Sequence, residues 1–358
     1  MIITREMGTV LPDTTMSSPV YMDVKQAPFK LYGFSEPFRR VPADVAEATS
    51  ENVKNLAKMS SGGRVRFRTN SDFIVVHGDY VTTGAINTSS FVATSSFDMF
   101  FYEGEGKHQF RGIFNPSQGN DKTYVESRIQ FTDSEMKDII LYFPLRANLR
   151  NVYIGLQEGC TLEEGSEYKY EKPVVFYGSS IVHGEGLLRP SSTYPAVLSR
   201  RLDCNFVNLG FSGSARAEKA IMEYIAGLDM SIFVYDYDYN ADSYGYLAET
   251  HYEGYKTFRA KHPDTPFIFA SRPNYWTRNY AFENYSLDWV EKRRKLIESN
   301  YERAKAEGDK NVYFVDGSKM FPEGFRDDCT MDGCHPNDLG YYFMANAFEK
   351  VLRPLLKK

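Results

Sequence analysis

Two adjacent serines, Ser179 and Ser180, follow an apolar run that ends at Gly178. The run, Val174–Tyr177, is typical of a buried parallel strand, and the glycine predicts a tight turn after it. A serine at that place lies at the carboxyl end of a strand, where open α/β sheets bind their ligands. We therefore predict that Ser180 is a nucleophile of the kind that ester hydrolases use.

A serine hydroxyl is a weak nucleophile and needs a base within hydrogen-bonding reach, itself oriented by a third group. Among six histidines, His335 lies in the segment Asp332–Asn337, after the fifth predicted strand and before the last predicted helix. That place is also the carboxyl edge of the sheet. Asp332, three residues earlier, can orient the second ring nitrogen, so we predict Asp332, His335 and Ser180 as orienting acid, base and nucleophile.

The other five histidines are weaker candidates for the base. His77 and His108 lie in the N-terminal half, where a structural or surface role is expected. His262 precedes a proline in a helix-ending turn, and His251 is expected on an exposed helical stretch. His183 could line the pocket, but it points away from the serine if a helix begins at the serine.

Acyl transfer also needs donors that face the negative charge developing on the carbonyl oxygen. The stretch Asn208–Ser214 follows the second predicted strand, and its glycines permit a backbone that exposes N–H groups. The stretch Tyr235–Asn240 follows the third predicted strand and brings an amide side chain to the same edge. The predicted oxyanion donors are the backbone N–H groups of Ser180 and Gly213 and the side chain of Asn240.

The C-terminal half that positions these residues alternates between strand and helix patterns. Strands are predicted at residues 174–177, 205–209, 231–235, 266–270 and 311–315, and helices at 193–202, 217–226, 247–261, 287–306 and 339–356. Strands alternating with helices at this spacing form a parallel sheet covered on both faces. The helix at 287–306, with Glu291, Lys292 and Arg293, is expected to present a charged face to solvent.

The N-terminal half is expected to form a separate domain made mostly of β-strands. Short strand patterns occur between residues 64 and 156, and one helical pattern lies between residues 41 and 60. In residues 64–69 basic and apolar residues alternate, which predicts a strand with one face in water. Several short strands at regular spacing predict a β-sandwich of jelly-roll type. The polar segment 163–167 marks the boundary, so the predicted domains are 1–165 and 166–358.

Four blocks of the C-terminal half, each at a strand end, resemble those of the SGNH (GDSL-type) hydrolase superfamily: Ser180, Gly213, Asn240, and the pair Asp332 and His335. The resemblance covers residues from about 173 to 358 and implies a three-layer α/β/α, flavodoxin-like hydrolase domain. The chain departs from the pattern twice. Ser179 replaces the usual acid of the first block, and residues 238–241 lack the glycine and the final acid of the third.

A jelly-roll-like domain ahead of such a hydrolase domain resembles the two-domain carbohydrate esterases of family two. That resemblance implies removal of acetyl groups from sugar hydroxyls without a metal or organic cofactor. Arg189 lies in a segment that also resembles these relatives, and it could line the pocket or brace its loop. Tyr239, Tyr275 and Trp276 are candidate substrate contacts, either as a platform on which a sugar ring stacks or as loop residues that pack internally.

Composition limits the partners that we expect. The 42 basic and 47 acidic residues give a net charge of −5, which argues against nucleic acid or an anionic membrane. No run of about eighteen apolar residues occurs, so no membrane span is predicted. The four cysteines lack paired metal-ligand spacing, and the N-terminus lacks a signal-peptide pattern. We therefore expect a cytoplasmic protein with reduced thiols and no metal.

Together these predictions describe a serine esterase that removes O-acetyl groups from acetylated carbohydrate, its small-molecule partner, through an acyl-enzyme. One alternative keeps the triad but changes the substrate to a lipid or small-molecule ester, which a broad apolar cleft would favour. Another alternative, suggested by the altered first and third blocks, is a carbohydrate-binding protein with a catalytically weak hydrolase domain. Retention of Ser180, Asp332 and His335 weighs against that alternative.

Overall fold

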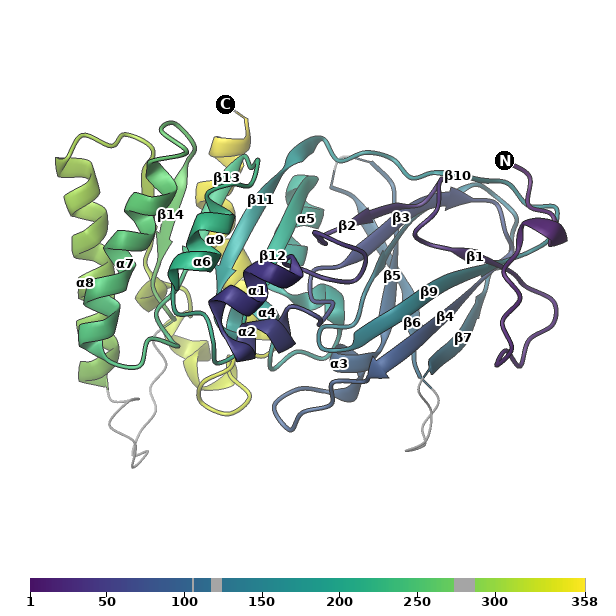
Figure 1. Cartoon of the computed structure of the whole chain (residues 1–358), viewed down its shortest axis with the longest axis horizontal. Coiled ribbons are helices and arrows are strands. Elements are labelled where there is room, and N and C mark those ends of the chain that lie inside the picture. Colours follow the sequence, from purple (N-terminus) through teal and green to yellow (C-terminus); the bar gives the residue numbers. More distant parts are fainter. Residues whose placement is uncertain (105, 117–123, 274–286, 358) are drawn as a thin grey trace. The chain divides into compact units, whose positions relative to one another are not determined.

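The computed structural model describes residues 1–104, 106–116, 124–273 and 287–357. It contains two compact units, each shown in Figure 1. The first comprises Met1–Arg40, Lys58–Lys169 and Leu188–Ser191, and the second comprises Val41–Ala57, Tyr170–Leu187 and Ser192–Lys358. The main division thus follows residue 169, whereas the sequence predicted it after residue 165.

The helical segment at residues 41–57 belongs to the second unit, although the sequence predicted it as an interruption of the first domain. It forms α1 (Ala43–Thr49) and α2 (Glu51–Leu56). The reason for the difference is packing, since α1 lies against α6 (Lys219–Ile225). A contact between segments so far apart in the sequence cannot be predicted from the local sequence pattern.

The first unit is built from two antiparallel sheets, as the sequence predicted for a sandwich. One has the strand order β1 (Val20–Asp23), β9 (Asn148–Leu156), β4 (Phe73–Thr82) and β7 (Tyr124–Gln130). The other has the order β10 (Leu162–Glu164), β3 (Arg64–Thr69), β8 (Lys137–Tyr142), β5 (Phe97–Tyr102) and β6 (His108–Phe114), with β2 (Lys30–Tyr32) paired to β3. A short helix, α3 (Phe91–Ser95), precedes β5.

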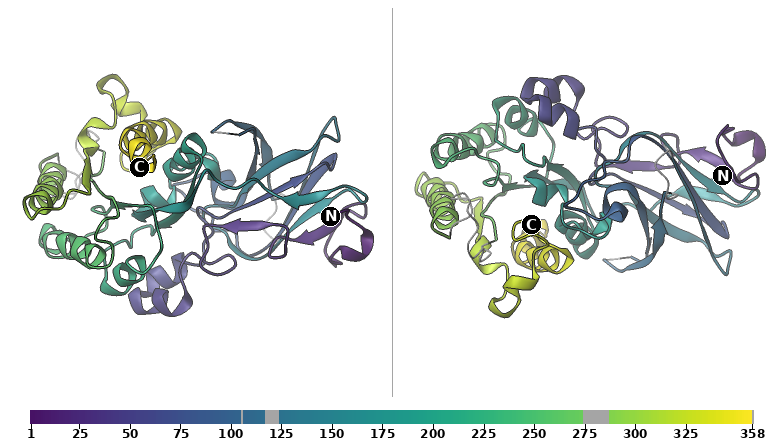
Figure 2. Two further views of the ribbon diagram at one scale, coloured as in Figure 1. Left: turned by 90° about the horizontal axis from the view of Figure 1, so that it is seen from above. Right: turned by 90° about the horizontal axis from the view of Figure 1, so that it is seen from below.

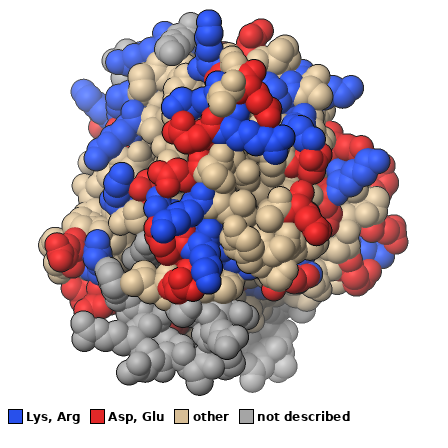
Figure 3. All heavy atoms as spheres, turned by 90° about the vertical axis from the view of Figure 1, so that its left-hand side faces the viewer, with Lys and Arg blue, Asp and Glu red and all other residues tan. Residues whose placement is uncertain are grey.

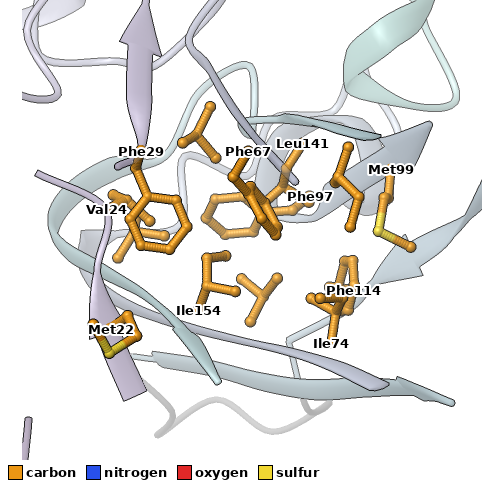
Figure 4. Close-up of a cluster of buried hydrophobic side chains, with 14 of the residues drawn as sticks. Met22, Val24, Phe29, Phe67, Ile74, Phe97, Met99, Phe114, Leu141 and Ile154 are labelled. Atoms are coloured by element: carbon orange, nitrogen blue, oxygen red, sulfur yellow. The ribbon is translucent and has the colours of Figure 1, made fainter. Parts of the chain in front are cut away.

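Apolar side chains from both sheets form the core of this unit (Figure 4). The labelled residues are Met22, Val24, Phe29, Phe67, Ile74, Phe97, Met99, Phe114, Leu141 and Ile154, all of them buried. Val24 and Phe29 lie next to β1 and β2, and the other eight lie within strands. Phe97 and Met99 of β5 occupy alternate positions, because successive side chains of a strand point to opposite faces.

The sequence predicted that one face of the strand at residues 64–69 lies in water, and this prediction was wrong for Arg64 and Arg66 of β3. Arg64 and Arg66 are fully buried. The Arg64 Nε donates to the hydroxyl of Tyr168 at 2.6 Å. The Arg66 guanidinium lies 4.4 Å from the ring centre of Tyr168 and 4.7 Å from that of Tyr102. Aromatic faces attract cations, so these rings cover a charged surface that an alternating pattern assigns to solvent.

The second unit is organised by a five-stranded parallel sheet. Its order is β12 (Cys204–Gly210), β11 (Tyr170–Gly178), β13 (Ile232–Asp236), β14 (Phe267–Ala270) and β15 (Val312–Val315). In chain order this is the 2-1-3-4-5 arrangement of flavodoxin-like sheets, as predicted. The chain reverses its direction of progress between β11 and β13, and ligand crevices form at such a switch point.

Helices cover both faces of this sheet (Figure 2). They are α4 (Ser180–His183), α5 (Tyr194–Leu202), α6, α7 (Tyr244–Arg259), α8 (Leu287–Ala306) and α9 (Asp338–Leu356). Helix α5 packs beside α9, and α7 packs beside both α6 and α8. None of the helices in the described ranges combines the length and apolarity needed to cross a membrane.

Aromatic residues fill the core on the α7 side of the sheet. Tyr177 and Tyr235 stack with ring centres 6.0 Å apart, and Tyr237 is fully buried beside them. His251 lies among these rings and is also fully buried, so the predicted exposed position was wrong. Burial lowers the pKa of His251 to about 3, which keeps the imidazole neutral in this core. Asn300 from α8 lies 3.1 Å from its Nδ1.

Helix α8 carries ion pairs along its surface. Lys292 pairs with Asp288 at 2.8 Å, and Arg294 pairs with Glu291 at 2.8 Å. Figure 3 shows acidic and basic side chains interspersed on the side of the molecule where α7 and α8 lie. Arg293 is an exception to the predicted solvated face, because its side chain is fully buried.

Candidate active site

The turn after β11 requires glycine and uses Ser179 as a helix cap. A Cβ on Gly178 would lie 2.2 Å from the carbonyl oxygen of Asp236, too close for any other residue. The Ser179 Oγ accepts a hydrogen bond from the Ile181 N–H at 3.2 Å and thereby caps α4. Serine and aspartate are both good caps, so the change in the first block preserves this turn.

The three predicted triad side chains lie in one hydrogen-bonded line. The Ser180 Oγ is 3.0 Å from the His335 Nε2. The His335 Nδ1 is 2.7 Å from the Asp332 Oδ2. Ser180 is only 7% exposed, yet its hydroxyl reaches a base that is itself held by an acid. This is the arrangement that converts a serine hydroxyl into a nucleophile.

The charges of the triad are set by these contacts. Burial raises the pKa of Asp332, but hydrogen bonds from the His335 side chain and backbone outweigh it and lower the pKa to about 2. Burial lowers the pKa of His335, but the hydrogen bond and charge of Asp332, with the charge of Glu185, hold it above its ordinary value. Asp332 is therefore ionised at neutral pH and stabilises the imidazolium that forms when Ser180 loses its proton.

The loop that carries His335 is held by bonds within itself. The Asp332 Oδ1 accepts the backbone N–H groups of Cys334 at 2.9 Å and His335 at 2.7 Å. The Asn337 Oδ1 accepts the N–H groups of Leu339 and Gly340, both at 3.1 Å, and so caps α9. The base therefore stands at a fixed place immediately before a long helix.

The predicted oxyanion donors occupy neighbouring loops of the second unit. The Ser180 N–H belongs to the first turn of α4, where backbone donors have no partner within the helix. Gly213 has φ of +68°, and no atom lies within 4 Å of the place where its Cβ would stand. The Asn240 Oδ1 accepts the Ala215 N–H at 3.3 Å, which leaves the Nδ2 as the donor end of that amide.

The Asn240 loop lacks the usual glycine and is held from outside by two buried arginines. The Arg272 Nε donates to the Asp238 Oδ1 at 3.0 Å, and its guanidinium lies 3.6 Å from the ring centre of Tyr239. Arg293 from α8 donates to the carbonyl oxygens of Asp238 at 2.6 Å and Ala241 at 2.9 Å. Contacts from these two arginines therefore hold the conformation of a loop whose own sequence lacks the usual glycine and final acid.

The predicted substrate contacts fall in different places. Arg189 belongs to the first unit, where its guanidinium lies 4.4 Å from the ring centre of Phe110 and its Nε 4.0 Å from the buried Asp98. These contacts are those of a bracing residue. Tyr239 is half-buried against Arg272. Tyr275 and Trp276 lie outside the described residues.

Three residues at the site escaped the sequence interpretation: Glu185, Arg272 and Arg293. Glu185 is buried, and its Oε2 lies 3.3 Å from the His335 Nε2. An acid placed five residues after the serine and between two glycines was the available signal. The sequence carries no comparable signal for the two arginines, because each contacts a loop that is distant from it in the sequence. Within the described ranges, no cluster of three or more His, Cys, Asp or Glu side chains is arranged to hold a metal ion.

The sequence matches a family model described as the GDSL-like lipase/acylhydrolase family over residues 171–353, about half of the chain. The chain belongs to this family. Residues 20–162 match the model of the N-terminus of SGNH-hydrolase-type esterases. The protein is therefore an esterase of the SGNH type with its own N-terminal domain, as the sequence predicted. No curated protein matches the sequence.

Several solved structures share the fold of the whole esterase. A candidate GDSL-like lipase from Bacteroides ovatus is 29% identical, with a TM-score of 0.84 over 94% of this chain and 98% of that one. A salicylyl-acyltransferase from a tetracycline biosynthetic pathway is 19% identical, with a TM-score of 0.75 over 95% and 98%. A family two carbohydrate esterase from Clostridium thermocellum, in complex with cellohexaose, is 15% identical, with a TM-score of 0.57 over 84% and 94%.

Proposed function

We propose that this esterase removes O-acetyl groups from acetylated carbohydrates, with Ser180 as nucleophile, His335 as base and Asp332 as orienting acid. The observation that carries the proposal is the unbroken line from the Ser180 hydroxyl through the imidazole to the carboxylate. The carbohydrate class is supported by the predicted resemblance to family two carbohydrate esterases and by the fold shared with one of them.

The reaction follows from the contacts of His335. Its Nε2 takes the proton of Ser180 while Oγ attacks the acetyl carbon, and the C=O bond electrons move onto the carbonyl oxygen. The tetrahedral intermediate collapses as Nε2–H protonates the departing sugar oxygen, which leaves an acetyl-serine. Water then loses a proton to Nε2, attacks the acetyl carbon and releases acetate, and the proton returns to the serine oxygen.

The oxyanion is stabilised by the N–H groups of Ser180 and Gly213 and by the Asn240 Nδ2. Donors that are fixed before the reaction cost no reorganisation when charge develops, and each contributes about 2.7–4 kcal/mol to transition-state stabilisation. Of these donors, the Asn240 side chain has the most support for being fixed in advance, since Arg272 holds Asp238 of its loop and the Ala215 N–H donates to the Asn240 Oδ1.

A second candidate substrate is a lipid or small-molecule ester. The fold similarity to the Bacteroides ovatus protein described as GDSL-like lipase favours it, as does the similarity to an acyltransferase that handles a small aromatic acyl group. Both substrates can react through the same triad by way of an acyl-serine, so the two candidates differ in the acyl group and the alcohol that the cleft recognises.

Acetate release from an aryl acetate and from acetylated xylo-, manno- and gluco-oligosaccharides tests the proposal. Ser180→Ala is expected to lower the rate by about 10³-fold or more. The matched control is Ser179→Ala, which removes only a helix cap, costs about 1 kcal/mol of folding stability and retains most activity. Full activity of Ser180→Ala would refute the catalytic assignment. Hydrolysis of acyl-lipids but not of acetylated oligosaccharides would favour the second candidate.

We further propose that the protein works in the cytoplasm. The support is the state of its cysteines, since Cys160, Cys204, Cys329 and Cys334, all within the described ranges, form no disulfide bond. Reduced thiols persist in compartments held at a low redox potential. Fractionation of the host cell with a tagged chain, followed by detection in the soluble cytoplasmic or the secreted fraction, tests this placement.

A further inference from the structure

Glu185 is a second carboxylate at the base, and the triad scheme gives it no role. Its Oε2 is 3.3 Å from the His335 Nε2, the same nitrogen that lies 3.0 Å from the Ser180 Oγ. Its side chain is 7% exposed, so water screens its charge only weakly. The imidazole is therefore flanked by Asp332 at one nitrogen and by Glu185 at the other.

The backbone on both sides of Glu185 is built to place it there. Gly184 ends α4 with φ of +112°, and Gly186 has φ of +91°. A Cβ on Gly186 would lie 2.2 Å from the carbonyl oxygen of Pro336, so only glycine lets this turn approach the His335 loop. The Glu185 N–H donates to the Ser180 carbonyl oxygen at 3.0 Å. The acid is thus tied to the helix that carries the nucleophile.

The other carboxylate oxygen is also engaged. The Glu185 Oε1 accepts a hydrogen bond from the Ser212 hydroxyl, one residue before Gly213. The Tyr341 hydroxyl, on α9, lies 2.9 Å from the Glu185 carbonyl oxygen. Contacts at the carboxylate and at the backbone therefore fix the direction in which Oε2 faces Nε2.

The geometry has opposite consequences for the two protonation states of His335. In the neutral base, Nδ1 carries the proton and Nε2 presents a lone pair, which a carboxylate at 3.3 Å repels. In the imidazolium, Nε2 carries a proton and a positive charge, which the same carboxylate attracts. Glu185 therefore favours the charged form that exists after Ser180 has lost its proton.

We propose that Glu185 is a positioning residue that stabilises the His335 imidazolium and so sets the acid limit of activity. The inference rests on the proposed function, in which neutral His335 is the base. Within the described ranges, the titratable groups that act on His335 are Asp332 on its own loop and Glu185 on the turn after α4, and Cys334 is its neighbour in the chain. The Cys334 thiol stays neutral, since burial raises its pKa to about 11.

The sign of the effect follows from the charges. An acid beside His335 raises its pKa, so the base becomes protonated, and activity falls, at a higher pH than it would without Glu185. Glu185→Gln keeps the shape and the acceptor for Ser212 but removes the charge. The acid limb of kcat/KM is expected to move to lower pH by about one unit. The plateau is expected to fall by about tenfold, because the transition-state imidazolium loses the same stabilisation.

The experiment measures pH profiles of aryl acetate hydrolysis for wild type, Glu185→Gln, Glu185→Asp and Glu349→Gln. Aspartate withdraws the charge by one methylene, so its limb should lie between those of wild type and the glutamine variant. Glu349 is a half-buried acid on α9 that pairs with Arg201, and its variant should keep the wild-type limb. Identical limbs in wild type and both Glu185 variants would overturn the inference.

Titration of the His335 imidazole by NMR in the same proteins separates the two proposals. If wild type hydrolyses no ester but the imidazole titrates at lower pH in Glu185→Gln, the proposed function fails and the electrostatic role of Glu185 stands. If Ser180→Ala abolishes hydrolysis while neither the imidazole titration nor the limb moves in Glu185→Gln, the role of Glu185 fails alone. Thermal unfolding checks that each variant is folded.

Discussion

The His335 loop and the Asn240 loop serve the same reaction but are held in different ways. In the His335 loop, Asp332 bonds to residues two and three positions later, and Asn337 caps the helix that follows. In the Asn240 loop, order comes from Arg272 and Arg293, which lie 32 or more residues further along the chain. The conformation of the His335 loop is thus held by contacts within the loop, whereas that of the Asn240 loop depends on residues distant in the sequence.

This difference explains why one loop could be interpreted from sequence and the other less well. When an acid lies three residues before a histidine, contact between their side chains can be predicted from the sequence without knowing the rest of the fold. A loop clamped by long-range ion pairs has no such local signature. It can also change its sequence freely, as the lost glycine and acid of the third block show, provided the clamps remain.

The largest expected effect comes from breaking the local bonds of the His335 loop. Asp332→Asn keeps the shape but removes the charge and the acceptor that select the imidazole tautomer, and it should lower kcat by about 10⁴-fold. Folding stability should change far less than with a buried acid, because the Asp332 side chain is 31% exposed. Steady-state kinetics with thermal unfolding measures both, and a kcat within tenfold of wild type would contradict the role of Asp332.

Removing one of the two arginines that hold the Asn240 loop should have the opposite pattern, with a large loss of folding stability. Arg272→Leu leaves the buried Asp238 carboxylate unpaired, which should cost about 3–5 kcal/mol of unfolding free energy. Urea denaturation measures the loss. The double variant Arg272→Leu with Asp238→Asn removes the unpaired charge and should recover part of the lost unfolding free energy. Equal stability of the single variant and wild type would show that the pair does not hold the loop.

The role of the clamped side chain itself is tested by Asn240→Ala. Losing one oxyanion donor should lower kcat by about 10²–10³-fold with little change in KM, because the donor acts on charge that develops only in the transition state. Asn205→Ala, at a half-buried amide of the same unit that donates to the Glu171 carbonyl oxygen, is the control and should leave kcat unchanged. A raised KM with normal kcat would mean that Asn240 binds substrate instead.

The smallest effect is expected at the end of the His335 loop. Asn337→Ala removes the cap of α9 and should cost about 1 kcal/mol of stability. Asn337→Asp retains an acceptor for the Leu339 and Gly340 N–H groups and should restore most of it. Thermal unfolding of the three proteins provides the comparison. A fully stable alanine variant would mean that α9 does not depend on this cap.

Much of the fold could be predicted because it depends on local patterns. The five strands of the parallel sheet and the helices between them follow from alternating apolar runs, and the sandwich follows from short strands. The errors concern charged and polar side chains in such patterns. Arg66 and Arg293 follow the expected surface periodicity, yet rings or carbonyl groups from elsewhere bury them. Glu185 was missed for a related reason, since its partner His335 is 150 residues away.

The early helices α1 and α2 have a consequence for the order in which the chain can fold. They belong to the second unit, and α1 packs on α6, yet α2 ends at Leu56 and α6 begins only at Lys219. At a synthesis rate of about 5–20 residues per second, the pair waits on the order of 10–30 s for its partner to leave the ribosome. During that interval the strands of the first unit emerge, so the nascent chain can complete most of its sandwich while these two helices remain without their partner.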